Sequence, residues 1–119
     1  MRKLEIGSHR FTEVNVLDEP GEGGACHEYQ VSEKTDGDTT RQFSYVHFQN
    51  GPVKENGVNG CFQEDLIAIV IDRLNSFQAG EFACSENEMA LNHLRTAMEW
   101  LNHRTRDRQD RGVEGTNKL

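Results

Sequence analysis

The sequence lacks most features that mark secreted, membrane or nucleic-acid-binding proteins. Only 34% of its 119 residues are hydrophobic, and no stretch approaches the roughly 20 apolar residues of a membrane span. No apolar run follows the first three residues, so we expect no signal peptide. The three cysteines are odd in number and far apart, which is typical of reduced thiols in a cytosolic protein. An excess of acids, 20 against 13 bases, argues against general nucleic-acid or membrane binding.

Catalytic and metal-binding motifs are equally scarce. The glycine-rich residues 21–24 lack the dinucleotide-binding spacing and precede no helix, so they indicate a turn. Cys26 and His27 are adjacent, but no second pair completes a zinc site. Glu99 and His103 share one helical face, where a surface pair is favoured over a metal site. We therefore expect no catalytic residue, no metal and no cofactor.

The first half of the chain has the patterning of β-strands. Apolar residues alternate with polar ones around Val14 and Val16, over residues 27–31 and over residues 42–49. A glycine-rich turn at 18–24 and a polar break at 34–40 separate these segments. The pattern predicts a small antiparallel sheet built from hairpins.

The second half has the spacing of two helices. Apolar residues recur at helical intervals from Phe62 to Phe77. A second helix is expected from Ser85, which we predict to form a capping box with Glu88, to about Arg108. We therefore expect an α+β fold in a single domain, 1–119, with the sheet over about 1–58, a two-helix hairpin over about 60–111 and a mobile tail over 112–119. Because so few residues are apolar, we expect the hairpin to mediate oligomerisation.

The second helix carries arginines along its expected buried face. We call these residues the arginine stripe: Asn87, Ala90, Leu94, Ala97, Leu101, Arg104, Arg108 and Arg111. The stripe is apolar in its first part and cationic in its last part, on the same face of the helix. Its arginines must therefore contact solvent or an anion. Asp107 and Asp110 nearby also fit an ordinary solvated helix face, so the pattern leaves both interpretations open.

The length of this helix favours a site made by two chains. Asn87 and Arg104 are 17 residues apart, about 25 Å at 1.5 Å per residue, which is too far for one small ligand to bridge. If two copies pack antiparallel, Asn87 of one chain can face Arg104 of the other, and two equivalent sites form. The free N–H groups of the helix start would favour phosphate there. Phe77 or Phe82 would be close enough to stack on a base.

Several blocks in a fixed order resemble a known family. They are Phe48-Gln-Asn-Gly-Pro-Val, Gly57-Val-Asn-Gly, Gln63-Glu-Asp-Leu, Phe77-Gln-Ala-Gly-Glu-Phe-Ala-Cys-Ser-Glu-Asn87 and Trp100-Leu-Asn-His-Arg104-Thr-Arg-Asp-Arg108-Gln-Asp-Arg-Gly-Val-Glu-Gly-Thr116. In this order they look like the first Thoeris anti-defence family of bacteriophages. The likeness covers residues 43–116.

The resemblance implies a sponge for a signalling nucleotide rather than an enzyme. Members of that family bind cyclic ADP-ribose isomers, such as glycocyclic ADP-ribose, made by TIR-domain Thoeris enzymes, and hold them without cleavage. By motif, Phe77 would stack on the adenine, Asn87 would bond the ligand, and Arg104 and Arg108 would grip the pyrophosphate. The family forms homodimers, and some members form hexamers as trimers of dimers.

Relatives in that family also bind cyclic di- or trinucleotides of the CBASS defence system at separate sites. Arg111 and Thr116 would belong to such a second site here. The implied location is the cytoplasm of the infected bacterial host, with no nucleic acid and no membrane as partner. The alternative from the residues themselves is a helical hairpin that docks a protein partner and binds no small molecule.

Overall fold

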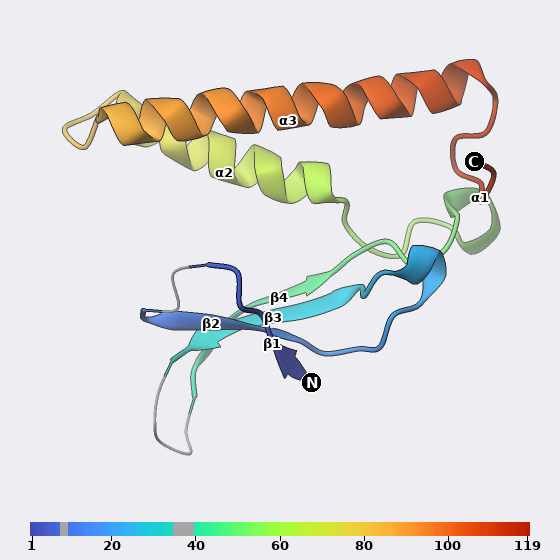
Figure 1. Cartoon of the computed structure of the whole chain (residues 1–119), viewed down its shortest axis with the longest axis horizontal. Helices are drawn as coiled ribbons and strands as arrows, with labels where there is room; N and C mark the ends of the chain where they lie inside the picture. The colour runs from blue at the N-terminus through green and yellow to red at the C-terminus, as the bar shows by residue number, and fades with distance from the viewer. Residues whose placement is uncertain (8–9, 35–39) are drawn as a thin grey trace. The chain divides into compact units, whose positions relative to one another are not determined.

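A computed structural model describes residues 1–7, 10–34 and 40–119. It divides into two compact units, residues 1–61 and 62–119. Most of the polar break predicted at 34–40 lies outside the described residues. The α+β class is confirmed, with an N-terminal antiparallel sheet followed by a C-terminal pair of helices (Figure 1). No helix in the described part of the chain is long and apolar enough to cross a membrane.

The first unit is a four-stranded sheet in the order β1-β2-β3-β4. Its strands are β1 (Arg2–Lys3), β2 (Thr12–Val16), β3 (Glu28–Glu33) and β4 (Gln42–His47), and every neighbouring pair is antiparallel. Val14 pairs with Val31, and Tyr29 pairs with Val46, so apolar side chains of successive strands share a face. Val16 is the most deeply buried residue of this sheet.

The loop over 17–27 joins β2 to β3 and contains the short 3-10 helix η1 (Glu22–Gly24), so the turn predicted there is confirmed. Gly23 and Gly24 have φ values of 72° and 78°, which favour glycine. The Asp18 carboxylate accepts hydrogen bonds from the backbone N–H groups of His27 (2.9 Å) and Glu28 (3.1 Å). These bonds hold the pKa of Asp18 below its usual value, the bond from His27 having the largest effect.

The second unit is the helical hairpin. After a one-turn helix α1 (Val53–Asn56) that belongs to the first unit, α2 (Gln63–Gln78) and α3 (Ser85–Asp110) pack against each other, as Figure 1 shows. Leu91 of α3 is 1% exposed and is the only apolar side chain of either helix that is fully buried. Ile69, Val70, Met89 and Trp100 are all exposed. The hairpin therefore leaves much apolar surface uncovered.

Candidate functional site

A hollow at the loop end of the hairpin brings together residues from both helices and from the loop. It has a volume of about 400 Å³ and is lined by Leu74 and Phe77 of α2, Phe82 of the loop and Asn87 of α3. Phe77 and Asn87, both named as ligand residues in the sequence analysis, therefore line the same hollow. Phe82 was named as an alternative stacking residue, and the structure places it beside Phe77 rather than in its stead.

Two aromatic rings shape this hollow. The rings of Phe77 and Phe82 are 6.2 Å apart between centroids and nearly perpendicular, at 87°. The guanidinium of Arg73, one turn before Phe77 on α2, stacks over the Phe77 ring at 5.0 Å from its centroid. Within residues 1–7, 10–34 and 40–119, no carboxylate forms an ion pair with Arg73. Sequence patterning missed Arg73, although its spacing of four residues from Phe77 is the signal that could have found it.

The start of α3 differs from the predicted capping box. Cys84 is the N-cap residue in an extended conformation, and no side chain caps the helix in the expected way. Ser85 is already the first helical residue, and its hydroxyl contacts Glu86 at 3.3 Å. The capping-box prediction is wrong because the side-chain amide of Gln78, at the end of α2, binds the backbone of Cys84 instead.

The buried face of α3 coincides with the arginine stripe only in part. The residues of α3 that are buried or half-buried are Asn87, Leu91, Leu94, Ala97, Met98, Leu101, Thr105 and Arg108. Five of the eight stripe residues are among them, whereas Ala90, Arg104 and Arg111 are exposed. Arg104 has no hydrogen bond or ion pair with any other residue in the part of the chain that the structure describes. It is therefore a free cation on an accessible face.

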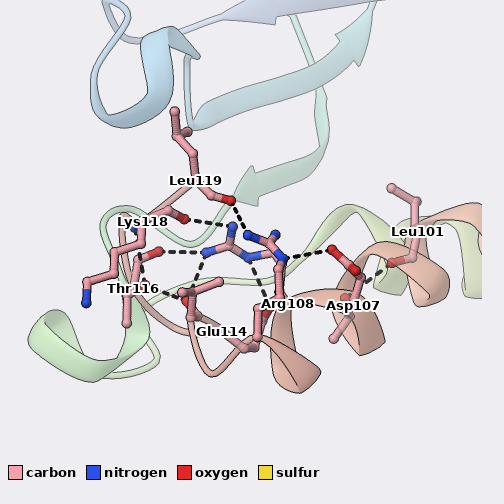
Figure 2. Close-up of polar contacts among 10 residues, drawn as sticks. Leu101, Asp107, Arg108, Glu114, Thr116, Lys118 and Leu119 are labelled. Atoms are coloured by element: carbon pink, nitrogen blue, oxygen red, sulfur yellow. Dashed lines mark hydrogen bonds and ion pairs between the residues drawn. The ribbon is translucent and has the colours of Figure 1, made fainter.

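Arg108 has the opposite environment, as Figure 2 shows. Only 8% of it is exposed. Its Nε donates to the Glu114 carboxylate at 3.2 Å, and its Nη1 donates to the Lys118 carbonyl at 2.9 Å. Its Nη2 donates to the carbonyls of Val113 and Thr116, both at 3.0 Å. Four tail acceptors thus occupy the guanidinium that the sequence had assigned to a pyrophosphate.

The remaining tail residues join this cluster. Arg111 pairs with Asp107 at 3.0 Å and donates to the Leu119 carbonyl at 2.7 Å. The Thr116 hydroxyl donates to the Val113 carbonyl. The tail, which we expected to be mobile, is instead folded back onto the end of α3 because Arg108 supplies donors for its carbonyls. Arg111 and Thr116 lie together here, and both are engaged in contacts within the chain.

One chain does not bring all four predicted ligand residues together. Phe77 and Asn87 lie at the loop end of the hairpin, whereas Arg104 and Arg108 lie near the far end of α3, about 25 Å away by the rise of the helix. The described residues contain no group of three or more His, Cys, Asp or Glu side chains that could hold a metal ion.

A second hollow lies on α3, lined by Glu99, Trp100, His103 and Arg106, with a volume of about 360 Å³. The rings of Trp100 and His103 are 5.8 Å apart. Glu99 and His103, which patterning treated as a surface pair, therefore flank an exposed tryptophan.

The fold and this site define a class of protein: a two-helix hairpin with an aromatic hollow at its loop and a cationic far end, appended to a small sheet. The chain belongs to a family with that hairpin, since the model of the Acb2/Tad1 hairpin domain matches residues 44–106. A relative from Bacillus phage SBSphiJ7, named Thoeris anti-defense 1, is 53% identical over 81 residues. The match covers 68% of this chain and 57% of that relative, so the chain spans little more than half of the relative's length.

Proposed function

We propose that this protein is a bacteriophage anti-defence protein that binds a cyclic ADP-ribose signal, such as glycocyclic ADP-ribose, without cleaving it. By sequestering the nucleotide made by a TIR-domain Thoeris enzyme in the cytoplasm of the infected host, it prevents activation of the immune effector. The observation that carries the proposal is the hollow in which Phe77 and Asn87 meet at the start of α3. Family membership and the name of the phage relative support it.

The chemistry of the hollow suits a nucleotide. Arg73 covers one face of the Phe77 ring, so the opposite face is proposed to stack on adenine, which contributes roughly 1–3 kcal/mol per base. The Asn87 amide carries both donors and an acceptor for the ribose or the base. No side chain caps the first turn of α3, so backbone N–H groups and the helix dipole there are available to a phosphate.

The phosphate-binding arginine is proposed to come from a second copy of the chain. Arg104 lies about 25 Å along α3 from Asn87, is exposed and has no partner among the described residues. Antiparallel packing of two α3 helices would bring Arg104 of one copy to the hollow of the other, and exposed Ala90 would allow close approach. The proposed assembly is a homodimer with two equivalent sites. A hexamer built as a trimer of dimers extends the same proposal.

Arg108 can serve as a phosphate ligand only by exchanging its tail acceptors for phosphate oxygens. Its bond to the Glu114 carboxylate already resembles the charge-assisted contact that a phosphate would make. Arg111 and Thr116 are proposed for a separate site that takes cyclic di- or trinucleotides of CBASS. That site would lie in the same cluster around the end of α3.

A retention experiment tests the proposed function. The protein is incubated with glycocyclic ADP-ribose, freed of unbound ligand and denatured, and the supernatant is analysed. Recovery of intact nucleotide supports a sponge, recovery of a cleaved product indicates a hydrolase, and no retention contradicts both. Arg104→Ala should weaken binding roughly ten- to a hundredfold, since a charge-assisted contact contributes about 1.5–3 kcal/mol. Arg106→Ala, two residues away and also exposed, is the matched control and should bind normally.

The second candidate is a docking module for a protein partner. The exposed Trp100, beside His103 and Arg106, favours it because tryptophan and arginine are enriched at the energetic centres of interfaces. A Trp100→Ala variant that retains the nucleotide but loses a partner captured from infected cells would favour this role. If the wild type and Trp100→Ala captured the partner equally well, the result would contradict a docking role for Trp100.

A further inference from the structure

The side chain of Gln78 closes the loop that forms the aromatic hollow. Gln78 is the last residue of α2 and is half-buried. Its Oε1 accepts a hydrogen bond from the Cys84 N–H at 3.0 Å, and its Nε2 donates to the Cys84 carbonyl at 3.0 Å. Nε2 also lies 3.5 Å from a carboxylate oxygen of Glu88. One side-chain amide thus binds both backbone groups of the residue that precedes α3.

The residues that line the hollow lie in the sequence before, within and after the loop that Gln78 binds at Cys84. Leu74 and Phe77 precede the loop, Phe82 lies within it, and Asn87 follows it. The loop also contains Gly80, the most flexible residue type. The separation of the walls therefore depends on what fixes the loop. At Cys84 the amide of Gln78 supplies two hydrogen bonds, beside the longer backbone bonds from Glu88 N–H to the Cys84 carbonyl and from Ala83 N–H to the Gly80 carbonyl, both 3.3 Å.

The two backbone bonds engage both the oxygen and the nitrogen of the Gln78 amide, and the second N–H of its nitrogen faces Glu88 at 3.5 Å. Gln78 also does not line the hollow. Its effect on a bound base can only be indirect, through the placement of Phe82 and of the first turn of α3 relative to Phe77. A pocket that is formed before binding spares the ligand the entropy of ordering a loop.

We propose that Gln78 is a positioning residue of the nucleotide site, an inference that rests on the proposed function. It holds the hollow in its binding shape and makes no contact with the ligand. Removal of its hydrogen bonds leaves both helices in place and lowers affinity by loosening the loop.

The test compares Gln78→Met, which keeps the length of the side chain and removes its hydrogen bonds, with Gln63→Met at the exposed start of α2 as control. Without ligand, hydrogen exchange at the Cys84 amide should accelerate roughly tenfold in Gln78→Met, while the Leu91 amide and the helix content stay unchanged. Affinity for glycocyclic ADP-ribose should fall about three- to tenfold. The control should match the wild type in each measurement.

A double variant separates positioning from direct contact. In a Phe77→Ala background, Gln78→Met should cause little further loss, because the ring that the loop serves is gone. Full additivity of the two losses, or unchanged affinity in Gln78→Met despite faster exchange at Cys84, would overturn the inference.

A wild-type protein that retains no nucleotide would instead overturn the proposed function, and with it the positioning role. Wild-type retention with an unaffected Gln78→Met overturns the positioning role alone.

Discussion

Arginines one turn apart on α3 perform different tasks because their surroundings differ. Arg104 is exposed and unpaired among the described residues, whereas Arg108 is enclosed by four acceptors from the tail. A guanidinium whose N–H groups bond to acceptors of the same chain stabilises the fold, whereas one whose N–H groups have no such acceptors is available to an anion. The same residue type at equivalent helical positions thus divides into an anchor and a candidate ligand contact.

The anchoring role predicts a local effect of Arg108→Ala. The substitution should release the tail, because it removes charge-assisted bonds worth about 1.5–3 kcal/mol each and leaves several carbonyls unpaired. Amides of the tail, such as those of Thr116 and Lys118, should exchange faster, while the Leu91 amide near the other end of α3 keeps its protection. Arg106→Ala is the control. Unaltered exchange throughout the tail in Arg108→Ala would contradict the anchoring role.

We predict that Asp18 makes the stability of the first unit depend on pH. Its pKa is lowered from 3.8, mainly by the hydrogen bond from the His27 N–H, so the ionised form is favoured in the folded state. The stabilisation is therefore present above pH 3.8 and is lost as the pH falls through the lower, folded-state pKa.

Thermal unfolding followed by circular dichroism across acid pH tests this effect. In Asp18→Asn, the unfolding midpoint should fall less steeply below about pH 4 than in the wild type, because the linked proton is gone. Glu19→Gln, an exposed neighbouring acid, should keep the wild-type profile. Identical profiles for Asp18→Asn and the wild type would rule out the effect.

At the scale of elements, the packing of α3 depends on a single fully buried side chain. Leu91→Ala should destabilise the hairpin by roughly 2–5 kcal/mol, since it removes a buried leucine and leaves a cavity. Met89→Ala, 57% exposed on the same helix, should change stability by no more than about 0.5 kcal/mol. Denaturant midpoints of the two variants provide the comparison. Equal losses would show that the hairpin does not depend on Leu91.

Patterning predicted the elements well and their faces less well. The strands around Val14 and over 27–31, and both long helices, follow from hydrophobic periodicity, which is a local signal. The two-residue strand β1 and the one-turn helix α1 are too short to show such a pattern, and neither was predicted. The arginine stripe includes Ala90, which is exposed, and leaves out its neighbour Leu91, which is buried. Only contact with α2 decides which of them is buried, so sequence alone chose the wrong one.

The candidate site divides in the same way. Phe77 and Asn87 could be predicted because motif blocks mark them, and the structure places them in one hollow. The contact between Gln78 and the residue before α3 could not be predicted, because Gln78 lies six residues from Cys84 and no known capping pattern has that spacing. The anchoring of the tail was also missed, since hydrogen bonds to backbone carbonyls have no signature in the sequence.

At the scale of the whole molecule, the hairpin exposes more apolar surface than an isolated pair of helices favours. Ile69, Val70 and Trp100 are exposed, and α2 has no fully buried side chain. If copies associate through α3, stability should depend on protein concentration. A hundredfold increase should add roughly 2.7 kcal/mol for each dimer and raise the unfolding midpoint by several degrees.

Ala90→Glu provides the matched variant for this prediction. Ala90 is exposed within one chain, so a glutamate there leaves the hairpin intact but places a charge on the proposed contact face. The variant should unfold at a midpoint independent of concentration and sediment as a monomer. A wild-type midpoint that is itself independent of concentration would contradict association through this face.

Gln78 binds the backbone of Cys84, but Cys84 as a whole is exposed and its thiol is in no disulfide. Cys26 is buried and Cys61 is half-buried, so the three thiols differ in accessibility. A fluorescent maleimide should therefore modify Cys84 first. The dye would lie at the rim of the aromatic hollow and provide an optical readout of its occupancy, so that ligands can be screened in solution.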